Sequence, residues 1–161
     1  MKVSYSWEDY KIIKASNGLK LEKWKDITLL RPDPIVIWNN GNLKNEKYDA
    51  IYHRSSSGGG YWENINNIPS SWQVKYKNLT FNIKQMGFKH TGLFPEQAVN
   101  WDRMIDKIRN SQKEIKVLNL FAYTGGATVA CLSAGASVTH VDSSKGMNEW
   151  AKENVKSSGL E

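Results

Sequence analysis

The chain has 161 residues, of which 40% are hydrophobic, and it carries seven Trp and seven Tyr. This composition is sufficient for a packed core and argues against disorder. The sequence shows no apolar run long enough for a membrane span and no signal-peptide pattern, and its single cysteine, Cys131, excludes an internal disulfide. Together these features predict a cytoplasmic protein.

The formal net charge of +6 is placed unevenly along the chain. Residues 1–85 hold 13 Lys and Arg against 8 Asp and Glu, whereas residues 86–161 hold 9 against 8. A basic N-terminal half suits contact with an anionic polymer. Ordinary solvated lysines are the alternative interpretation, because net charge informs non-specific binding and not fold.

The first third of the chain has the pattern of β-structure. Two short runs over residues 10–24 flank Asn17-Gly18, which tolerates positive φ at both turn positions and therefore predicts a hairpin. Pro32-Asp33-Pro34 predicts a turn between two apolar runs, because proline cannot donate to a ladder. A polar loop is expected next, before residue 50.

A small-residue loop and a second pair of strands are predicted before the helical second half of the chain. Six small residues, Ser55 to Gly60, lie between aromatic-bearing runs and predict a flexible loop, which either closes over a ligand or is a plain linker. Alternation from Val74 to Ile83 predicts two strands with a turn near Lys77-Asn78.

The second half of the chain changes to helical and parallel-strand patterns. Apolar residues at 98, 101, 104, 105 and 108 predict a helix, with Pro95 in its first turn. Residues 116–123, KVLNLFAY, predict a short strand that is fully buried, as strands of a parallel sheet are.

The remaining residues predict a helix, a second strand and another helix. Residues 127–136, ATVACLSAGA, form a helix closed by Gly135, and residues 137–144, SVTHVDSS, form the strand. Residues 145–159 form the last helix, which ends at Gly159. The β-α-β-α order implies parallel strands joined by right-handed crossovers.

The ends of the two predicted strands indicate a ligand site. Residues 124–126, Thr-Gly-Gly, carry little bulk where ligands sit in such units, and the next helix would point its N–H groups there. Asp142 follows the second strand, where a carboxylate can accept hydrogen bonds from both ribose hydroxyls. The pair predicts a nucleoside-containing cofactor. Alternatively, Asp142 caps the last helix, with Ser143 and Ser144 as rival caps.

The loop sequence TGGATVA narrows the choice of cofactor. It lacks both the G-x-G-x-x-G spacing of a dinucleotide site and the Gly-Lys-Ser/Thr of a Walker loop. These absences disfavour NAD and ATP and favour S-adenosylmethionine (SAM), which has a carboxylate at its methionine end and a ribose at its adenosine end.

Several segments resemble bacterial class I SAM-dependent methyltransferases, in the branch related to the large-subunit ribosomal RNA cytosine carbon-5 methyltransferases. The segments are FKHTGLFPEQAVNWDRM, VLNLFAYTGGATVACLSAGASVTHVDSSKGMNEWAKENVKSSGL, LLRPDPIVIW and GGGYWE, and the resemblance runs from about Gly18 to the last residue. It implies an α/β protein: a β-rich N-terminal domain on the RNA side, residues 1–85, and the first βαβα half of a Rossmann-like SAM-binding domain, residues 86–161.

The resemblance also implies which residues bind SAM. Those lining its methionine side would be Asn119, Phe121, Ala122, Tyr123 and Gly125. Asp142, with Ser143 beside it, would hold the ribose. Closure over the methionine end would come from Thr91, Phe94 and Gln97. Many class I enzymes carry an acidic residue where this chain has Asn119; an amide can still bond SAM, but it adds no negative charge.

Other reactive side chains have structural interpretations. The three histidines, at 53, 90 and 140, have no ligand spacing, so no metal site is predicted. His140 is interpreted as a packed or capped core histidine. Cys131 is interpreted as a small buried residue and not a methyl-transfer nucleophile, because no activating neighbour accompanies it.

The family fold has a seven-stranded sheet, of which this chain would supply two parallel strands. Its later motifs have no counterpart here, so we expect a truncated polypeptide whose catalytic residues lie beyond Glu161. Such a polypeptide would bind SAM weakly or not at all, and its open sheet edge is where a dimer could form. The parent protein would methylate an RNA base. The alternatives are a nicotinamide-dependent oxidoreductase and a non-enzymatic nucleic-acid-binding module.

Overall fold

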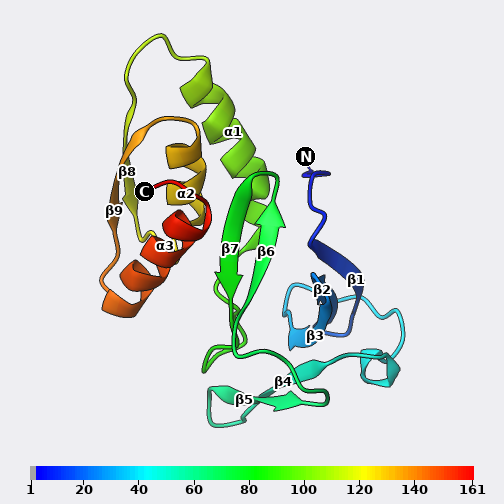
Figure 1. The fold of residues 1–161 in the computed structure, drawn as a ribbon. Helices are drawn as coiled ribbons and strands as arrows, with labels where there is room; N and C mark the ends of the chain where they lie inside the picture. Colours follow the sequence, from blue (N-terminus) through cyan, green and yellow to red (C-terminus); the bar gives the residue numbers. More distant parts are fainter. Residues whose placement is uncertain (1–2) are drawn as a thin grey trace. The chain divides into compact units, whose positions relative to one another are not determined.

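The computed structural model describes residues 3–161, which form two compact units (Figure 1). The β-rich unit contains residues 7–74 and 83–92. Of the described residues, the α/β unit contains 3–6, 75–82 and 93–161. The two units therefore interleave along the chain, and no single boundary after residue 85 separates them. The functional domain expected over residues 1–85 stays a prediction.

The β-rich unit is built on a five-stranded sheet of order β1-β2-β3-β4-β5. Its strands are β1 (Tyr10–Ser16), β2 (Leu19–Trp24), β3 (Ile27–Pro32), β4 (Ala50–Arg54) and β5 (Gly60–Asn64). Neighbouring strands pair antiparallel, except that β3 and β4 are parallel. Leu21, Leu30 and Ile51 pack on one face with Leu43, which lies in the short 3₁₀ helix η1 (Leu43–Asn45).

The predicted turns of this unit are confirmed. Asn17 and Gly18 have φ of 48° and 73°, the two positive values that a tight two-residue hairpin turn requires. Strand β3 ends at Pro32, where the chain turns as expected. Residues 55–59 connect β4 to β5 as a loop.

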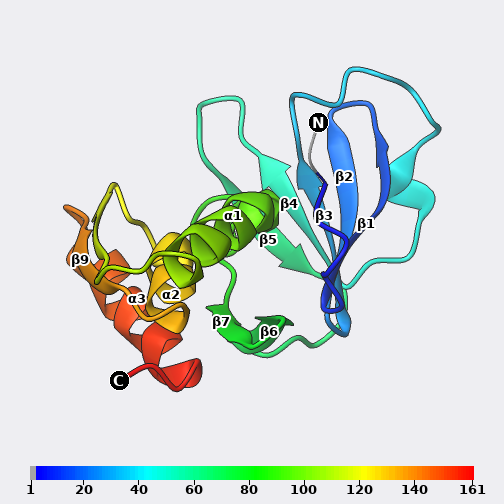
Figure 2. The same cartoon turned by 90° about the horizontal axis from the view of Figure 1, so that it is seen from above.

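The α/β unit contains most of the second half of the chain. Its elements are residues 75–82 of the hairpin β6 (Trp72–Tyr76) and β7 (Leu79–Ile83), then η2 (Pro95–Gln97), α1 (Ala98–Arg109), β8 (Lys116–Leu120), α2 (Gly126–Ser133), β9 (Ser137–Val141) and α3 (Lys145–Ser157). Strands β8 and β9 are parallel, with Asn119 opposite His140, as the β-α-β-α order predicts. Helices α2 and α3 lie on the same side of this strand pair (Figures 1 and 2).

Local sequence explains the helix boundaries. Helix α1 buries Ala98, Trp101 and Ile105 at helical spacing, and Pro95 lies in the 3₁₀ turn just before it. Helix α3 begins after Ser144, whose Oγ accepts a hydrogen bond from the Met147 N–H. Among residues 3–161, no helix combines the length and apolarity needed to cross a membrane.

The prediction that residues 116–123 form a fully buried strand is wrong. Strand β8 ends at Leu120, because Phe121 turns into the left-handed region with φ of 52°. Leu118 and Leu120 are 62% and 54% exposed, because α2 and α3 cover only the other face of β8 and β9. Within the described residues β8 pairs only with β9, and a dimer formed through its open edge stays a prediction.

Candidate functional site

The turn after β8 is the centre of the predicted site. Phe121 and Tyr123 both have φ of 52°, and Gly125 has φ of 82°. The Ala122 N–H donates to the Val141 carbonyl at 3.0 Å, which fastens the turn to the end of β9. Left-handed backbone at non-glycine residues is unfavourable and is enriched at functional sites. The two strand ends are thus held together, as the predicted site requires.

Asp142 joins the two strand ends through its carboxylate. Oδ2 accepts the Tyr123 backbone N–H at 2.9 Å, and Oδ1 accepts the Ser144 N–H at 2.9 Å. These two N–H donors lower the pKa of Asp142, so the carboxylate is ionised. Each oxygen keeps a further lone pair for a ligand hydroxyl. Ser144 caps α3, while Ser143 is exposed beside Asp142.

The glycine pair has a packing role that the sequence did not indicate. A Cβ on Gly125 would lie 3.0 Å from the Cβ of Ala151 in α3. A Cβ on Gly126 would lie 2.9 Å from Cζ2 of Trp101 in α1. The distance at Gly126 is too short for a real Cβ contact, and the distance at Gly125 is tighter than most such contacts. The absence of side chains here therefore lets α2 pack closely between its two neighbours.

Six of the predicted site residues line one pocket of about 140 Å³ in the α/β unit: Phe94, Gln97, Asn119, Phe121, Ala122 and Tyr123. The rings of Phe94 and Tyr123 have their centroids 5.3 Å apart. Typical small-molecule sites measure about 300–1,000 Å³. The pocket therefore has room for one end of a cofactor and not for all of it.

The other four predicted residues do not line this pocket. Gly125 and Asp142, with Ser143, lie just outside it along the same turn and strand end. Thr91 is part of the β-rich unit, where its carbonyl accepts the Lys84 N–H. The Thr91 hydroxyl is buried without a hydrogen-bond partner.

A chain of polar side chains lies beneath the turn. Asn119 Nδ2 donates to Thr128 Oγ1 at 2.9 Å, and Thr128 Oγ1 lies 2.8 Å from His140 Nδ1. Because Thr128 accepts from Asn119, its hydroxyl proton is available for the Nδ1 of a neutral imidazole. Asn119 Oδ1 makes no hydrogen bond within the described structure, so it remains an acceptor for a ligand.

The charge state of His140 fits this arrangement. Burial lowers the pKa of His140, while Asp142 and Asn148 act in the opposite direction. The ring is therefore neutral near pH 7, in agreement with its interpretation as a packed histidine. Thr128 was not among the predicted site residues; the only sequence signal for it was its position in the first turn of the helix that follows the glycines.

Asn154 anchors the same turn from α3 and was also missed. Its side chain is fully buried, its Nδ2 donates to the Thr124 carbonyl at 2.8 Å, and its Oδ1 accepts the Asn82 N–H at 2.7 Å. The sequence signal for this role was a polar residue on the inner face of α3, which is otherwise lined by Trp150 and Ala151.

The remaining reactive candidates have structural roles. Cys131 is buried with its Sγ 3.8 Å from Met104 Sδ, and burial raises the pKa of the thiol. The interpretation of Cys131 as a small buried residue is confirmed. In the described part of the chain, no group of three or more His, Cys, Asp or Glu side chains is placed to hold a metal ion.

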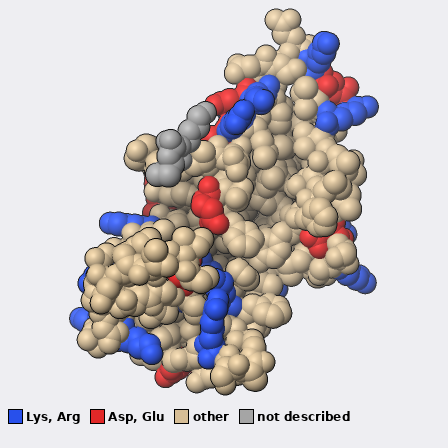
Figure 3. Space-filling view, turned by 180° about the vertical axis from the view of Figure 1, so that it is seen from behind, with Lys and Arg blue, Asp and Glu red and all other residues tan. Residues whose placement is uncertain are grey.

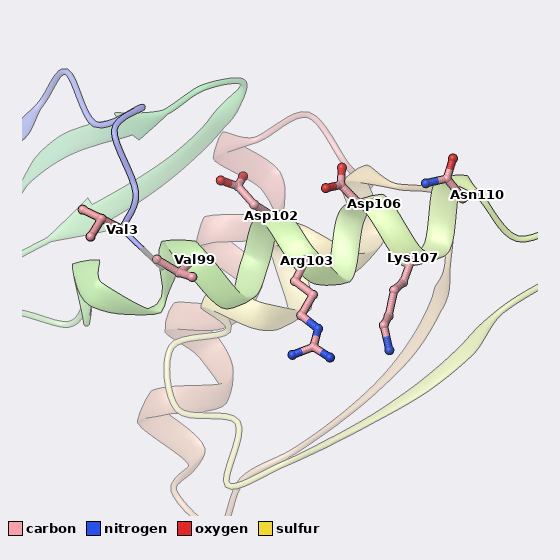
Figure 4. A pocket seen from close by; sticks show the side chains of 7 residues that line it. All are labelled: Val3, Val99, Asp102, Arg103, Asp106, Lys107 and Asn110. Atoms are coloured by element: carbon pink, nitrogen blue, oxygen red, sulfur yellow. The ribbon is translucent and has the colours of Figure 1, made fainter. Parts of the chain in front are cut away.

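A larger hollow of about 680 Å³ lies along α1, but it lacks convergent polar groups. It is lined by Val3, Val99, Asp102, Arg103, Asp106, Lys107 and Asn110. Figure 4 shows Arg103 and Lys107 pointing away from the side on which Asp102 and Asp106 lie. Asp102 is already bonded at 2.6 Å by both the Tyr76 hydroxyl and the Lys77 ammonium. This hollow is not a candidate active site.

The fold and the site together define a class of protein. A parallel βαβα unit with a small-residue turn after its first strand and an acid after its second has the architecture of Rossmann-like cofactor-binding folds. A crystal structure of a SAM-dependent methyltransferase from Agrobacterium tumefaciens matches this chain with a TM-score of 0.90 and 36% identity. The match covers 98% of this chain and 51% of that chain. A methyltransferase solved in complex with S-adenosylhomocysteine, at 16% identity and a TM-score of 0.66, shares the fold.

The curated relatives that this chain matches are methyltransferases of ribosomal RNA. Ribosomal RNA large subunit methyltransferase K/L of Shewanella frigidimarina is 42% identical over 81 residues, and that of Magnetococcus marinus is 31% identical over 116 residues. The matches cover 50% and 71% of this chain but only 11% and 16% of the relatives. The chain thus spans less than a fifth of the length of these relatives. No protein-family model matches it. The resemblance to SAM-dependent methyltransferases is confirmed.

Proposed function

We propose that this chain is part of a SAM-dependent methyltransferase that acts on RNA, with a ribosomal RNA base as the target. Two relatives are named for methylation of large-subunit ribosomal RNA, and the solved structure that shares 36% identity is a SAM-dependent methyltransferase. The observation that carries the proposal is the closure of the Tyr123 turn onto the ionised carboxylate of Asp142.

The residues of this site suit the two ends of SAM. Asp142 has lone pairs for the two ribose hydroxyls, and Asn119 Oδ1 is an acceptor for the ammonium of the methionine end. Phe94 and Gln97 line the same pocket as Asn119 and would close over that end. When bound, SAM supplies an activated methyl group; the residues of this chain hold and orient the cofactor.

No residue of this chain is assigned to the methyl-transfer step. The one cysteine is buried and its pKa is raised, so it does not supply a thiolate to attack a base. His140 faces Thr128 beneath the turn and not the pocket. The chain is assigned to cofactor binding, and catalysis by the whole protein needs further groups.

An NMR titration tests this function. Amide shifts of the isotopically labelled chain are recorded during addition of SAM and, in parallel, of NADH. We expect SAM to bind weakly and to move the resonances of residues 121–126 and 142–144. A stronger response of the same amides to NADH would favour the oxidoreductase, and an unmoved turn at saturating SAM would refute the cofactor site.

A further inference from the structure

Four cationic side chains gather in the β-rich unit, and we call Lys20, Arg31, Arg54 and Lys89 the cationic cluster. Lys20 of β2 pairs in register with Arg31 of β3. Arg31 Nη1 donates to the Lys89 carbonyl at 3.0 Å, and Lys89 Nζ donates to the Pro32 carbonyl at 3.0 Å. The backbone of residue 89 is therefore fixed beside the end of β3.

Two acids lie within the cluster and leave it with an excess of positive charge. Glu22 is fully buried and is bonded by Arg31 through Nε and, at 2.9 Å, through Nη2. Asp33 pairs with Lys20 at 3.4 Å. Two carboxylates face four cations. Arg54 is exposed, and its side chain makes no ion pair or hydrogen bond in the part of the chain that the structure describes.

The cations are close enough to repel one another. Burial lowers the pKa of Lys89, and after burial Arg54 is the largest further cause, with Arg31 and Lys20 adding to it against Asp33. A bound anion would relieve this repulsion. Hydrogen bonds place the two cations on one side of the sheet, because Trp62 donates to residues 86 and 88 on the face of β4 and β5 that carries Arg54.

An exposed aromatic residue, Phe88, directly precedes Lys89 of the cationic cluster. Strand alternation places Arg54 on the same face of β4 as Tyr52, which pairs with Trp62 of β5. Trp62 Nε1 lies 3.0 Å from each of two carbonyls, those of Met86 and Phe88, so the segment before Lys89 covers this face. The Phe88 side chain is 62% exposed.

We propose that Arg54, Lys89 and Phe88 form a surface that binds a single-stranded segment of RNA, with the cations on its phosphates and the Phe88 ring stacked on a base. Guanidinium and ammonium groups neutralise phosphates, and aromatic rings next to them stack bases without a strong sequence preference. Arg54 also leads directly into the small-residue loop 55–59, where a strand can approach the backbone closely. The choice of RNA as ligand rests on the proposed function.

Fluorescence anisotropy tests this surface. The 161-residue chain is titrated into a fluorescein-labelled 20-nucleotide single-stranded RNA of mixed sequence at several salt concentrations. Arg54→Gln should weaken binding roughly fivefold at low salt and reduce the magnitude of the slope of log affinity against log salt by about 0.7, the value for one lost phosphate contact. Arg54→Lys should keep the slope. Phe88→Ala should weaken binding at least about fivefold and leave the slope unchanged.

Lys152→Gln is the matched control, because Lys152 is an exposed cation in the other unit. Absence of RNA binding by the wild-type chain, or an effect of Arg54→Gln no larger than that of Lys152→Gln, would overturn the proposal. Heparin binding as tight as RNA, with no effect of Phe88→Ala, would show a general anion site and would also overturn it. The SAM titration reads amides 121–126, so failure of this surface and failure of the cofactor site give separate results.

Discussion

The backbone N–H of Tyr123 donates to Oδ2 of Asp142 at 2.9 Å across 19 residues of sequence. The bond fixes the turn after β8 against the end of β9, so the two candidate contact points for the ends of SAM keep one geometry. The acceptor also bonds the Ser144 N–H through its other oxygen. One carboxylate therefore supports the turn and, in the proposed function, would also bind the ribose of SAM.

Asp142→Ala is expected to weaken the affinity for SAM, read from the amide shifts of residues 121–126, by about tenfold or more. This is the scale of a hydrogen bond to a charged group. The substitution removes the ribose acceptor and the bond to Tyr123 together. NMR titration measures the effect. Glu149→Gln is the control, because Glu149 is an exposed acid in a surface pair with Lys152. Equal responses of the two variants would contradict the role of Asp142.

Gly126→Ala is expected to destabilise the chain by about 1–3 kcal/mol, because the new Cβ would meet Trp101 at 2.9 Å. Gly125→Ala should cost about 1–2 kcal/mol from its left-handed backbone alone, with the contact to Ala151 added. Urea denaturation followed by circular dichroism measures both.

Gly146→Ala provides the comparison for these two glycines. Gly146 lies in the first turn of α3, and the atom nearest to an added Cβ is Ser144 Oγ at 3.9 Å. The substitution should be neutral or stabilise by up to about 1 kcal/mol, since alanine is the better helix former. Close packing of α2 would be disproved if Gly126→Ala proved as harmless as this control.

Asn154→Ala should destabilise the α/β unit by about 2–4 kcal/mol, because it leaves the Thr124 carbonyl and the Asn82 N–H without their partner. The loss should also speed hydrogen exchange at the amides of residues 123–126, which the buried side chain anchors. Lys152→Ala, an exposed site on the same helix, should change neither quantity. Unchanged exchange in Asn154→Ala would mean that the turn is held by the strand ends alone.

The stability of the chain is expected to depend on His140 as the pH falls below about 6.5, the ordinary pKa of histidine. Burial lowers the pKa of His140 below its ordinary 6.5, so the unfolded chain takes up the proton first as the pH falls. The free energy of unfolding should therefore decrease from pH 6.5 down to the pKa of the folded state. His140→Gln should flatten this part of the profile, measured by urea denaturation at each pH. Thr139→Val, at the exposed neighbour, should keep the wild-type slope.

The sequence by itself determined the local elements. Asn17-Gly18 predicted the first hairpin because two adjacent residues with positive φ define such a turn. Helical spacing predicted α1, and the order of small and apolar runs predicted parallel pairing of β8 and β9. The motif around Tyr123 and the acid at 142 also predicted which strand ends would meet. Each of these signals depends on residues within a few positions, or on the order of whole elements.

Only the tertiary structure decided which side chains are buried and which distant segments pack against them. Leu118 has the sequence pattern of a buried strand residue, yet its face of β8 is bare, because burial depends on segments that arrive from elsewhere in the chain. Gly126 needs its small size because of Trp101, and Asn154 is satisfied by Asn82, 72 residues away. Contacts between distant segments follow from packing, and no local pattern of residue types specifies them.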